Sequence, residues 1–144
     1  MESKDRTFLG TGWGFPPTFR REWFGVEMIS NEEDIVSSIR IILATVTGER
    51  VMLPTFGCNL RPHVFDQLNA ANIALIEKIV HDALVFHEPR IIVQELSCTV
   101  SQEAGTIEIA VGYIVITTNT RYNMVFPYYY EEATNLERPV LQSK

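Results

Sequence analysis

The sequence predicts a single α+β domain in which two helices pack on a three-stranded antiparallel β-meander, preceded by an irregular aromatic-rich segment. Three observations predict it. Apolar residues recur at helical spacing in the middle of the chain, the period changes to two from Arg90 onward, and turn-forming residues separate three alternating stretches. We expect residues 1–29 to form the irregular segment, residues 30–130 the single domain and residues 131–144 an acidic tail.

The composition limits the classes of partner. The chain has 144 residues and a net charge of −6, from 18 acidic and 12 basic side chains. It therefore lacks the basic field that nucleic acid requires. No apolar run approaches the roughly 18 residues of a membrane span, and the first residues do not form an apolar signal peptide. We expect a cytoplasmic protein with no nucleic-acid partner and no membrane insertion.

The first segment is rich in glycine, proline and aromatic residues. Gly10, Gly12 and Gly14 precede Pro16 and Pro17, and this density argues against a regular helix or strand. The aromatic side chains need to pack against something, either their own domain or another chain, and both alternatives stay open. The glycine spacing superficially resembles a dinucleotide fingerprint, but its spacing and the expected flanking structure do not fit.

Two helices follow in the sequence. Ser30-Asn31-Glu32-Glu33 has the pattern of a capping box and predicts a helix of about 17 residues that Gly48 ends. A candidate short strand lies at Val51–Leu53, and a helical turn is expected over His63–Leu68. Asn69 caps the second helix, and Pro89 ends it.

Three strands complete the predicted domain, at residues 91–101, 106–118 and 121–130. The side chains expected on one face are Ile92, Leu96, Cys98 and Val100 in the first strand, Ile107, Ile109, Val111, Tyr113 and Val115 in the second, and Tyr122, Met124, Phe126, Tyr128 and Tyr130 in the third. Pro127 lacks an N–H group, which predicts an edge position for the third strand. The opposite face of the middle strand ends with apolar Ile114 and Ile116, so it needs cover from the first segment or from a neighbouring chain.

The sequence contains no recognisable catalytic or metal-binding pattern. His81 and His87 are six residues apart, about 240° around a helix, so they do not face one ion. Cys58 and His63 are too few for a structural zinc site. Cys58 and Cys98 are interpreted as free, packed thiols. We expect no catalytic residue, no metal and no cofactor.

One enzymatic alternative remains, a carboxylate pair for glycoside hydrolysis. Glu49, Asp66 and Glu88 lie in or beside predicted loops. Such a pair must lie about 5–10 Å apart, and one member needs a raised pKa.

Two local motifs do indicate a function. Glu88-Pro89-Arg90 places a carboxylate, a fixed backbone angle and a guanidinium at the junction of helix and strand. It can form an internal bridge or anchor a partner. The second motif is the loop from Gly48 to Gly57, which places charges, a proline and an aromatic side chain between two glycines. This pattern favours a loop of fixed shape that binds a partner.

With these motifs the sequence resembles the lysozyme-like baseplate wedge family of contractile tails, which includes the wedge subunit of T-even phages and TssE of type VI secretion. The resemblance covers about residues 8–130. It rests on Gly10–Pro16, the Gly48–Gly57 loop, Glu88-Pro89-Arg90-Ile91 and Asn123-x-x-Phe126-Pro127-Tyr128. Thr55 and Cys58 depart from the residues more usual in the loop.

The resemblance implies a structural protein rather than an enzyme, with a peptidoglycan-cleaving muramidase as the alternative. Family members lie in a six-fold baseplate next to the tube and join other baseplate wedge proteins to sheath subunits. Glu88, Pro89 and Arg90 are the family's contact with wedge proteins, and the terminal sheet is implied to start sheath polymerisation by strand sharing.

The partner contacts expected from the residues themselves lie in two places. The loop supplies Glu49, Arg50, Pro54, Phe56 and Gly57. The strand at 91–101 offers an edge without proline and with many β-branched residues, which suits strand addition. We expect this edge, or a neighbouring one, to accept a strand from a sheath subunit.

Overall fold

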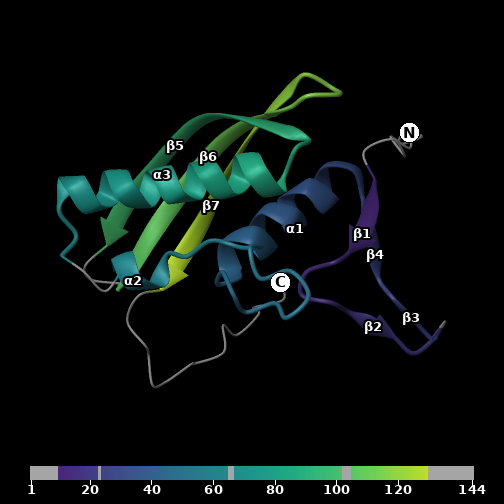
Figure 1. Ribbon diagram of the computed structural model, residues 1–144. Coiled ribbons are helices and arrows are strands. Elements are labelled where there is room, and N and C mark those ends of the chain that lie inside the picture. Colours follow the sequence, from purple (N-terminus) through teal and green to yellow (C-terminus); the bar gives the residue numbers. More distant parts are fainter. Residues whose placement is uncertain (1–9, 23, 65–66, 102–104, 130–144) are drawn as a thin grey trace.

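The computed structural model describes residues 10–22, 24–64, 67–101 and 105–129. Helices cover one face of a three-stranded antiparallel sheet, and a ribbon of short strands lies beside the helices (Figure 1). This arrangement confirms the predicted α+β class. The acidic tail predicted at 131–144 lies outside the described residues, and the boundary between residues 29 and 30 stays a prediction.

The sheet consists of β5 (Ile91–Ser101), β6 (Thr106–Val115) and β7 (Thr120–Tyr129), in the order β5-β6-β7. The prediction of an edge position for Pro127 is confirmed, because β7 pairs only with β6 among the described strands. β6 ends three residues earlier than expected. The chain turns over residues 116–119, and the Asn119 N–H donates to the Val115 carbonyl at 2.8 Å.

A β-bulge corrects one predicted face. Val93 pairs with Tyr113 and Glu95 pairs with Gly112, so Gln94 is an extra residue in β5. Because one inserted residue reverses the alternation of side chains, Ile92 is exposed, whereas Leu96, on the same predicted face, packs against the core. The prediction for Ile92 was therefore wrong. The core faces predicted for β6 and for the described part of β7 are confirmed.

The first helix, α1 (Asn31–Ala44), is shorter than predicted and begins differently. The Ser30 side chain makes no capping hydrogen bond, so the predicted capping box is wrong. Ser30 is instead the last residue of a strand and pairs with Thr11. The helix ends before Gly48 because Thr45 is extended and its N–H and hydroxyl both donate to the Ile41 carbonyl.

The second half of the helical layer largely follows the prediction. α3 (Ala70–His87) begins at Asn69, whose side chain accepts a hydrogen bond from the Asn72 N–H at 2.9 Å. The expected helical turn is α2 (Arg61–Val64), which starts two residues earlier. The candidate strand at Val51–Leu53 is not a strand, because these residues form an exposed bend.

The first segment contains short strands, which corrects the expectation that glycine and proline would prevent them. β1 (Thr11–Trp13) pairs with β4 (Met28–Ser30), and β2 (Phe19–Arg20) pairs with β3 (Gly25–Val26). The glycines and prolines limit these strands to two or three residues. We call the described residues between 10 and 30, which contain these four strands, the N-terminal ribbon. It packs on α1.

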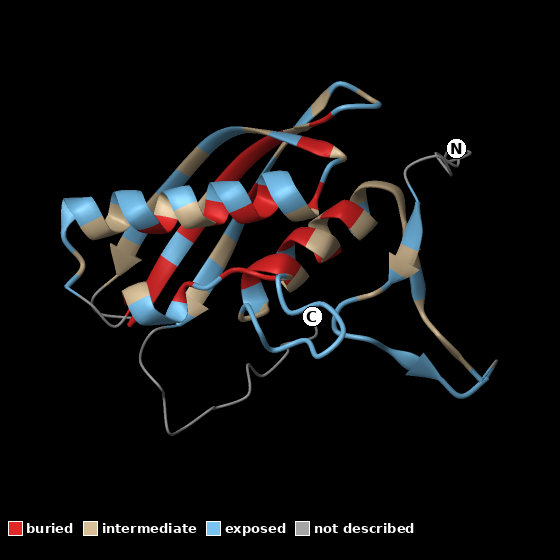
Figure 2. Ribbon diagram, viewed as in Figure 1, coloured by how far each residue is buried: buried red, intermediate tan, exposed pale blue. Residues whose placement is uncertain are grey.

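The core lies between the helices and the inner face of the sheet (Figure 2). Its largest fully buried apolar side chains are Ile35, Ile39, Ile42, Leu43, Leu60, Ile76, Leu84, Ile107, Ile109 and Tyr113. The outer face of the sheet keeps Ile92 and Val125 exposed, and Ile116 is exposed just beyond it. Within the described residues, no helix is long and apolar enough to cross a membrane.

Candidate functional site

A cluster of three charged side chains joins the end of α3, the start of β5 and the first turn of α1. The guanidinium of Arg90 donates to both carboxylate oxygens of Glu88, from Nε at 2.6 Å and from Nη2 at 2.7 Å. Its Nη1 donates to Asp34 at 2.7 Å. A bidentate pair of this kind fixes both position and orientation. Arg90 therefore holds three segments of the chain together.

The side chains of this cluster are largely shielded from solvent. Glu88 is 2% exposed, and the Arg90 side chain is 29% exposed. Burial alone would raise the pKa of the Glu88 carboxyl, but hydrogen bonds from Arg90 and Ser38 hold that pKa below its ordinary value. The hydrogen bond that Arg90 donates to Glu88 also raises the pKa of Arg90. Glu88 is therefore ionised near neutral pH in the fold.

The cluster also explains two glycines of the N-terminal ribbon. A Cβ atom on Gly12 would collide with the Asp34 carboxylate, and one on Gly10 would touch the Arg90 guanidinium at 3.4 Å. Gly10 also has a φ of 96°, which disfavours other residues. The glycines let the ribbon pass directly over the ion cluster.

This geometry settles how the Glu88-Pro89-Arg90 motif is arranged inside the chain. Of the two alternatives left open by the sequence, the internal bridge is present. The Glu88 carboxylate is turned into the fold, so a partner would meet exposed Pro89 and the open side of Arg90.

The loop between α1 and α2 is closed by backbone hydrogen bonds. The Gly48 N–H donates to the Pro54 carbonyl, and the Cys58 N–H donates to the Thr45 carbonyl, both at 2.8 Å. The Glu49 carboxylate accepts from the Val46 N–H at 3.1 Å. The loop thus has the fixed shape that its sequence predicts.

The loop is anchored beside the charged cluster. The Arg50 guanidinium lies 4.1 Å from the centre of the Phe56 ring, and Phe56 contacts the His87 ring at 4.9 Å between centroids. His87 immediately precedes Glu88. The structure thus brings the two sequence motifs together.

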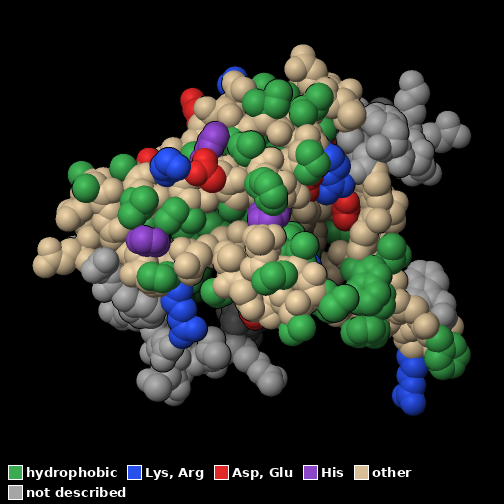
Figure 3. Space-filling model, in the orientation of Figure 1, with side chains coloured by type: hydrophobic (Ala, Val, Ile, Leu, Met, Phe, Trp, Pro, Cys, Tyr) green, Lys and Arg blue, Asp and Glu red, His purple; other side chains and the backbone are tan. Residues whose placement is uncertain are grey.

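Sequence reasoning missed the most exposed part of this loop. Val51 is 94% exposed and Met52 is 95% exposed, and Leu53 is half-exposed beside them. Three consecutive apolar residues at the tip of a rigid loop are typical of a protein–protein contact. The signal was present in the sequence, where the same residues were interpreted as a strand. We call Val51–Leu53 the loop tip. In the space-filling view, apolar side chains are scattered among polar ones over the visible face of the molecule (Figure 3).

The candidate carboxylates do not form a glycosidase site in the described structure. The lowered pKa of Glu88 is opposite to what a general acid needs. Glu49 is exposed and its carboxylate accepts a hydrogen bond from the loop backbone. Asp66 lies outside the described residues. The described part of the chain also holds no group of three or more His, Cys, Asp or Glu residues suited to a metal ion.

A family model described as baseplate wedge protein gp25 matches residues 29–120. The chain belongs to this family. The matched region runs from the end of the N-terminal ribbon to the start of β7, and so contains the ion cluster and the closed loop. It confirms the resemblance inferred from the sequence motifs. A comparison with curated proteins finds no match.

Several solved structures share the fold. A Geobacter sulfurreducens structure described as a tail lysozyme is 44% identical over 76% of this chain and 99% of that chain, with a TM-score of 0.69. A chain of the anti-feeding prophage baseplate is 20% identical over 90% of this chain and 92% of that chain, with a TM-score of 0.64. A chain of the type VI secretion baseplate complex is 14% identical over 68% and 92%, with a TM-score of 0.59. This gp25-family chain is accordingly a baseplate component of a contractile injection system.

Proposed function

We propose that this baseplate protein is a non-enzymatic connector that joins other wedge proteins to the first ring of sheath subunits. The observation that carries the proposal is the division of the molecule into two exposed contact regions. One region is the loop tip, with the Pro89–Arg90 corner linked to the same loop through the Phe56–His87 contact, and the other is formed by the two strands that border the described sheet. A connector needs two such regions, because it must hold two partners at once.

The wedge contact is assigned to the first region. The closed loop holds Val51 and Met52 in a fixed position, so their burial against a partner costs little conformational entropy. The Arg50 guanidinium stacked on Phe56 supplies a positive group at the base of the tip. We propose that a wedge protein buries the loop tip and places a carboxylate near Arg50.

The sheath contact is assigned to the sheet. An edge strand presents a row of backbone N–H and C=O groups that an extended segment of another chain can pair with. The sheet has two such edges, since its described order is β5-β6-β7. Strand addition from a sheath subunit would continue this sheet. We place the protein inside the assembled particle, in a multiple of six copies.

Co-expression with the wedge and sheath proteins of the same particle tests the proposal. A Val51→Glu, Met52→Glu double variant should lose the wedge proteins in a pull-down and keep the sheath contact. The matched control is Thr117→Glu, an exposed residue in the turn between β6 and β7. Wedge binding that survives the double variant, or sheaths that form normally on particles lacking this chain, would refute the connector role.

The muramidase alternative is supported by the description of the Geobacter structure alone. The described carboxylates do not supply the acid that such an enzyme requires, because Glu88 is held ionised. We therefore propose a structural role for both the fold and the ion cluster.

A further inference from the structure

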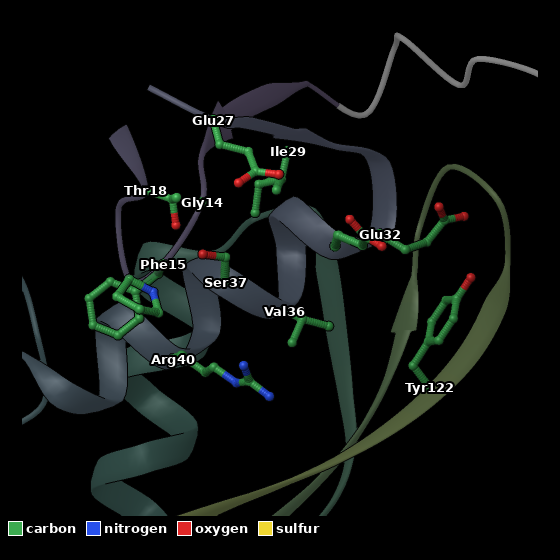
Figure 4. Close-up of a pocket in the computed structure, with 12 residues that line it drawn as sticks. Gly14, Phe15, Thr18, Glu27, Ile29, Glu32, Val36, Ser37, Arg40 and Tyr122 are labelled. Atoms are coloured by element: carbon green, nitrogen blue, oxygen red, sulfur yellow. The ribbon is translucent and has the colours of Figure 1, made fainter. Parts of the chain in front are cut away.

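A pocket of about 470 Å³ lies between α1 and the N-terminal ribbon. Val36 and Ser37 of α1 line one wall, and Phe15 and Ile29 of the ribbon line another (Figure 4). Tyr122 of β7 completes this mainly apolar lining. The volume is within the range of ligand-binding pockets. The described lining includes no residue of the loop tip, so the pocket is separate from the wedge contact proposed above.

Several polar groups around the pocket already have partners in the fold. The Glu27 N–H donates to the Thr18 carbonyl at 2.8 Å, within the ribbon. The Glu27 carboxylate accepts hydrogen bonds from the Arg20 guanidinium at 3.4 Å. Glu32 and Tyr122 also interact with other groups of the protein. These groups are therefore satisfied without a ligand.

The hydroxyl of Ser37 is not satisfied in this way. Ser37 is 6% exposed, and its Oγ atom has no hydrogen-bond partner among the described residues. Few buried polar atoms in native proteins stay unpaired. Figure 4 shows the Ser37 side chain on the side of α1 that faces the ribbon, in the wall of the pocket. A polar group of a ligand in the pocket would supply the missing hydrogen bond, and the serine side chain can change rotamer to meet it.

Two charged residues flank Ser37 on the same side of α1. Glu33 comes four residues before it and Arg40 three residues after it, and residues at these spacings share one face of a helix. Both side chains line the pocket and both are exposed. Seven residues of helix separate them by about 10 Å, which is too far for a direct ion pair. Neither makes an ion pair or hydrogen bond with another described side chain.

This row of an anion, a hydroxyl and a cation indicates what the pocket can hold. A complementary ligand carries a positive group near Glu33, a negative group near Arg40 and a backbone amide near Ser37. In an extended polypeptide, alternate side chains point the same way and lie about 6–7 Å apart. A Lys or Arg and an Asp or Glu four residues apart therefore reach both charges. The apolar side chain midway between them faces the pocket.

We propose that the pocket between α1 and the ribbon binds an extended segment of a neighbouring baseplate protein other than the sheath subunit. A basic residue of the segment pairs with Glu33, an acidic residue pairs with Arg40, and a backbone group bonds to Ser37. The apolar residue between the two charges packs against Val36 and Phe15. This contact goes beyond the proposed function, because it is a third region that uses neither the loop tip nor the backbone of a sheet edge.

Photo-cross-linking in co-expressed baseplates tests the proposal. Benzoylphenylalanine takes the place of Thr18, an exposed residue in the lining of the pocket. We expect a cross-link to one segment of another baseplate protein, in which mass spectrometry finds a basic and an acidic residue on either side of an apolar one. A cross-linked segment without this charge pattern, a cross-link to the sheath or to a second copy of the chain, or no cross-link at all would overturn the proposal.

Charge variants test the two ion pairs. Glu33→Gln and Arg40→Gln should each lower the cross-linking yield roughly two- to five-fold, the effect of losing an exposed ion pair. The double variant Glu33→Arg, Arg40→Glu keeps the net charge and should lower the yield further. Exchanging the two charged residues of the cross-linked segment should then restore it. The matched controls are Arg21→Gln and Glu22→Gln, at exposed positions between β2 and β3. Equal yields for the controls and the charge variants would refute the pairing.

Ser37→Ala separates binding from folding. In the free chain this change removes only an unpaired hydroxyl, so the thermal unfolding temperature should stay the same or rise. In the baseplate the same change removes the hydrogen bond to the segment, so the cross-linking yield should fall. A lower unfolding temperature would show that Ser37 has a partner inside the fold. That result, or an unchanged yield, would overturn its assignment to a ligand.

The outcomes separate this contact from the connector role. The charge exchange at Glu33 and Arg40 should leave both wedge binding through the loop tip and sheath attachment unchanged. Loss of sheath attachment with this double variant would assign the pocket to the sheath and overturn the proposal. Wedge binding that survives the Val51→Glu, Met52→Glu variant refutes the connector, yet the cross-link from the pocket would still stand.

Discussion

Arg90 and Asp34 are 56 residues apart in the sequence, yet their side chains form a 2.7 Å ion pair at the junction of α1, α3 and β5. Arg90 also donates to both carboxylate oxygens of Glu88, which has almost no contact with solvent. The motif that looks like a surface signature in the sequence is therefore a structural clamp whose outer side alone is exposed. Changes to it affect folding as well as binding.

Replacing Arg90 should destabilise the domain. Arg90→Ala leaves a buried carboxylate without its cation, a change that costs about 3–5 kcal/mol. An alanine variant of this motif is therefore expected to lose stability as well as any partner that the motif contacts. Chemical denaturation measures the free energy of unfolding, and Arg21→Ala, at an exposed position, is the control. Equal stability of the two variants would contradict the clamp.

The same carboxylate should make the protein sensitive to acid. The folded-state pKa of Glu88 lies below its ordinary value of 4.5. Its contribution to the free energy of unfolding is thus complete above pH 4.5 and is lost as the pH falls through the folded-state pKa.

Glu88→Gln removes this titrating group. Its free energy of unfolding should be lower near neutral pH and should fall less steeply in acid than that of the unmodified protein. Parallel acid dependence in the two proteins would show that Glu88 does not contribute.

The shape of the closed loop should depend on Gly57 more than on Gly48. Gly57 has a φ of 112°, and a Cβ atom there would collide with the Thr45 carbonyl. Gly48 has a φ of 93°, but open space lies around it. Gly48→Ala therefore loses about 1–3 kcal/mol of folding free energy through backbone strain alone. Gly57→Ala has the same strain and a steric collision in addition. Thermal unfolding should show the larger loss with Gly57→Ala, and equal losses would argue against the loop closure described.

The two cysteines should be poorly reactive in the folded protein. Burial raises the pKa of the Cys58 thiol to about 12, with a smaller contribution from Cys98, and burial likewise raises the pKa of Cys98 to about 12. The thiolate is the reactive form, so alkylation by iodoacetamide at pH 8 should be slow until denaturant is added. Rapid alkylation of the native protein would contradict this arrangement.

Peptidoglycan hydrolysis should be absent. A turbidity assay on cell walls compares the unmodified protein with Glu49→Gln, Asp66→Asn and Glu88→Gln. We expect no clearing with any of them, because Arg90 lowers the pKa of Glu88 and the Glu49 carboxylate is exposed and accepts a hydrogen bond from the loop backbone. Clearing that disappears with one substitution would establish the enzymatic alternative.

The sequence predicted the parts of the fold that follow from periodic patterns. The core face of β6 and the Asn69 cap of α3 were both correct, since each depends on residues close together in the sequence. The bulge at Gln94 was not predictable, because an inserted residue shows only in the pairing with Gly112. Ser30 was misinterpreted because its pairing with Thr11 overrides its local preference for capping.

The candidate site, too, was only partly predictable from the sequence. The rigid loop and the charged motif were recognisable from composition, but their contact through Phe56 and His87 depends on tertiary structure. The third member of the cluster, Asp34, was not recognised from the sequence. No local signal links it to Arg90, because the two residues meet only after α1 and β5 have packed.

The close passage of Gly12 over Asp34 couples the ribbon to the ion cluster. The ribbon contains only short strand pairs, so we expect its position to depend on its contact with Asp34, which Arg90 holds in place. The rate of proteolysis at exposed residues of the ribbon should therefore depend on whether the ion cluster is intact. A cut near Phe24 would report from outside whether the charged residues in the interior have assembled.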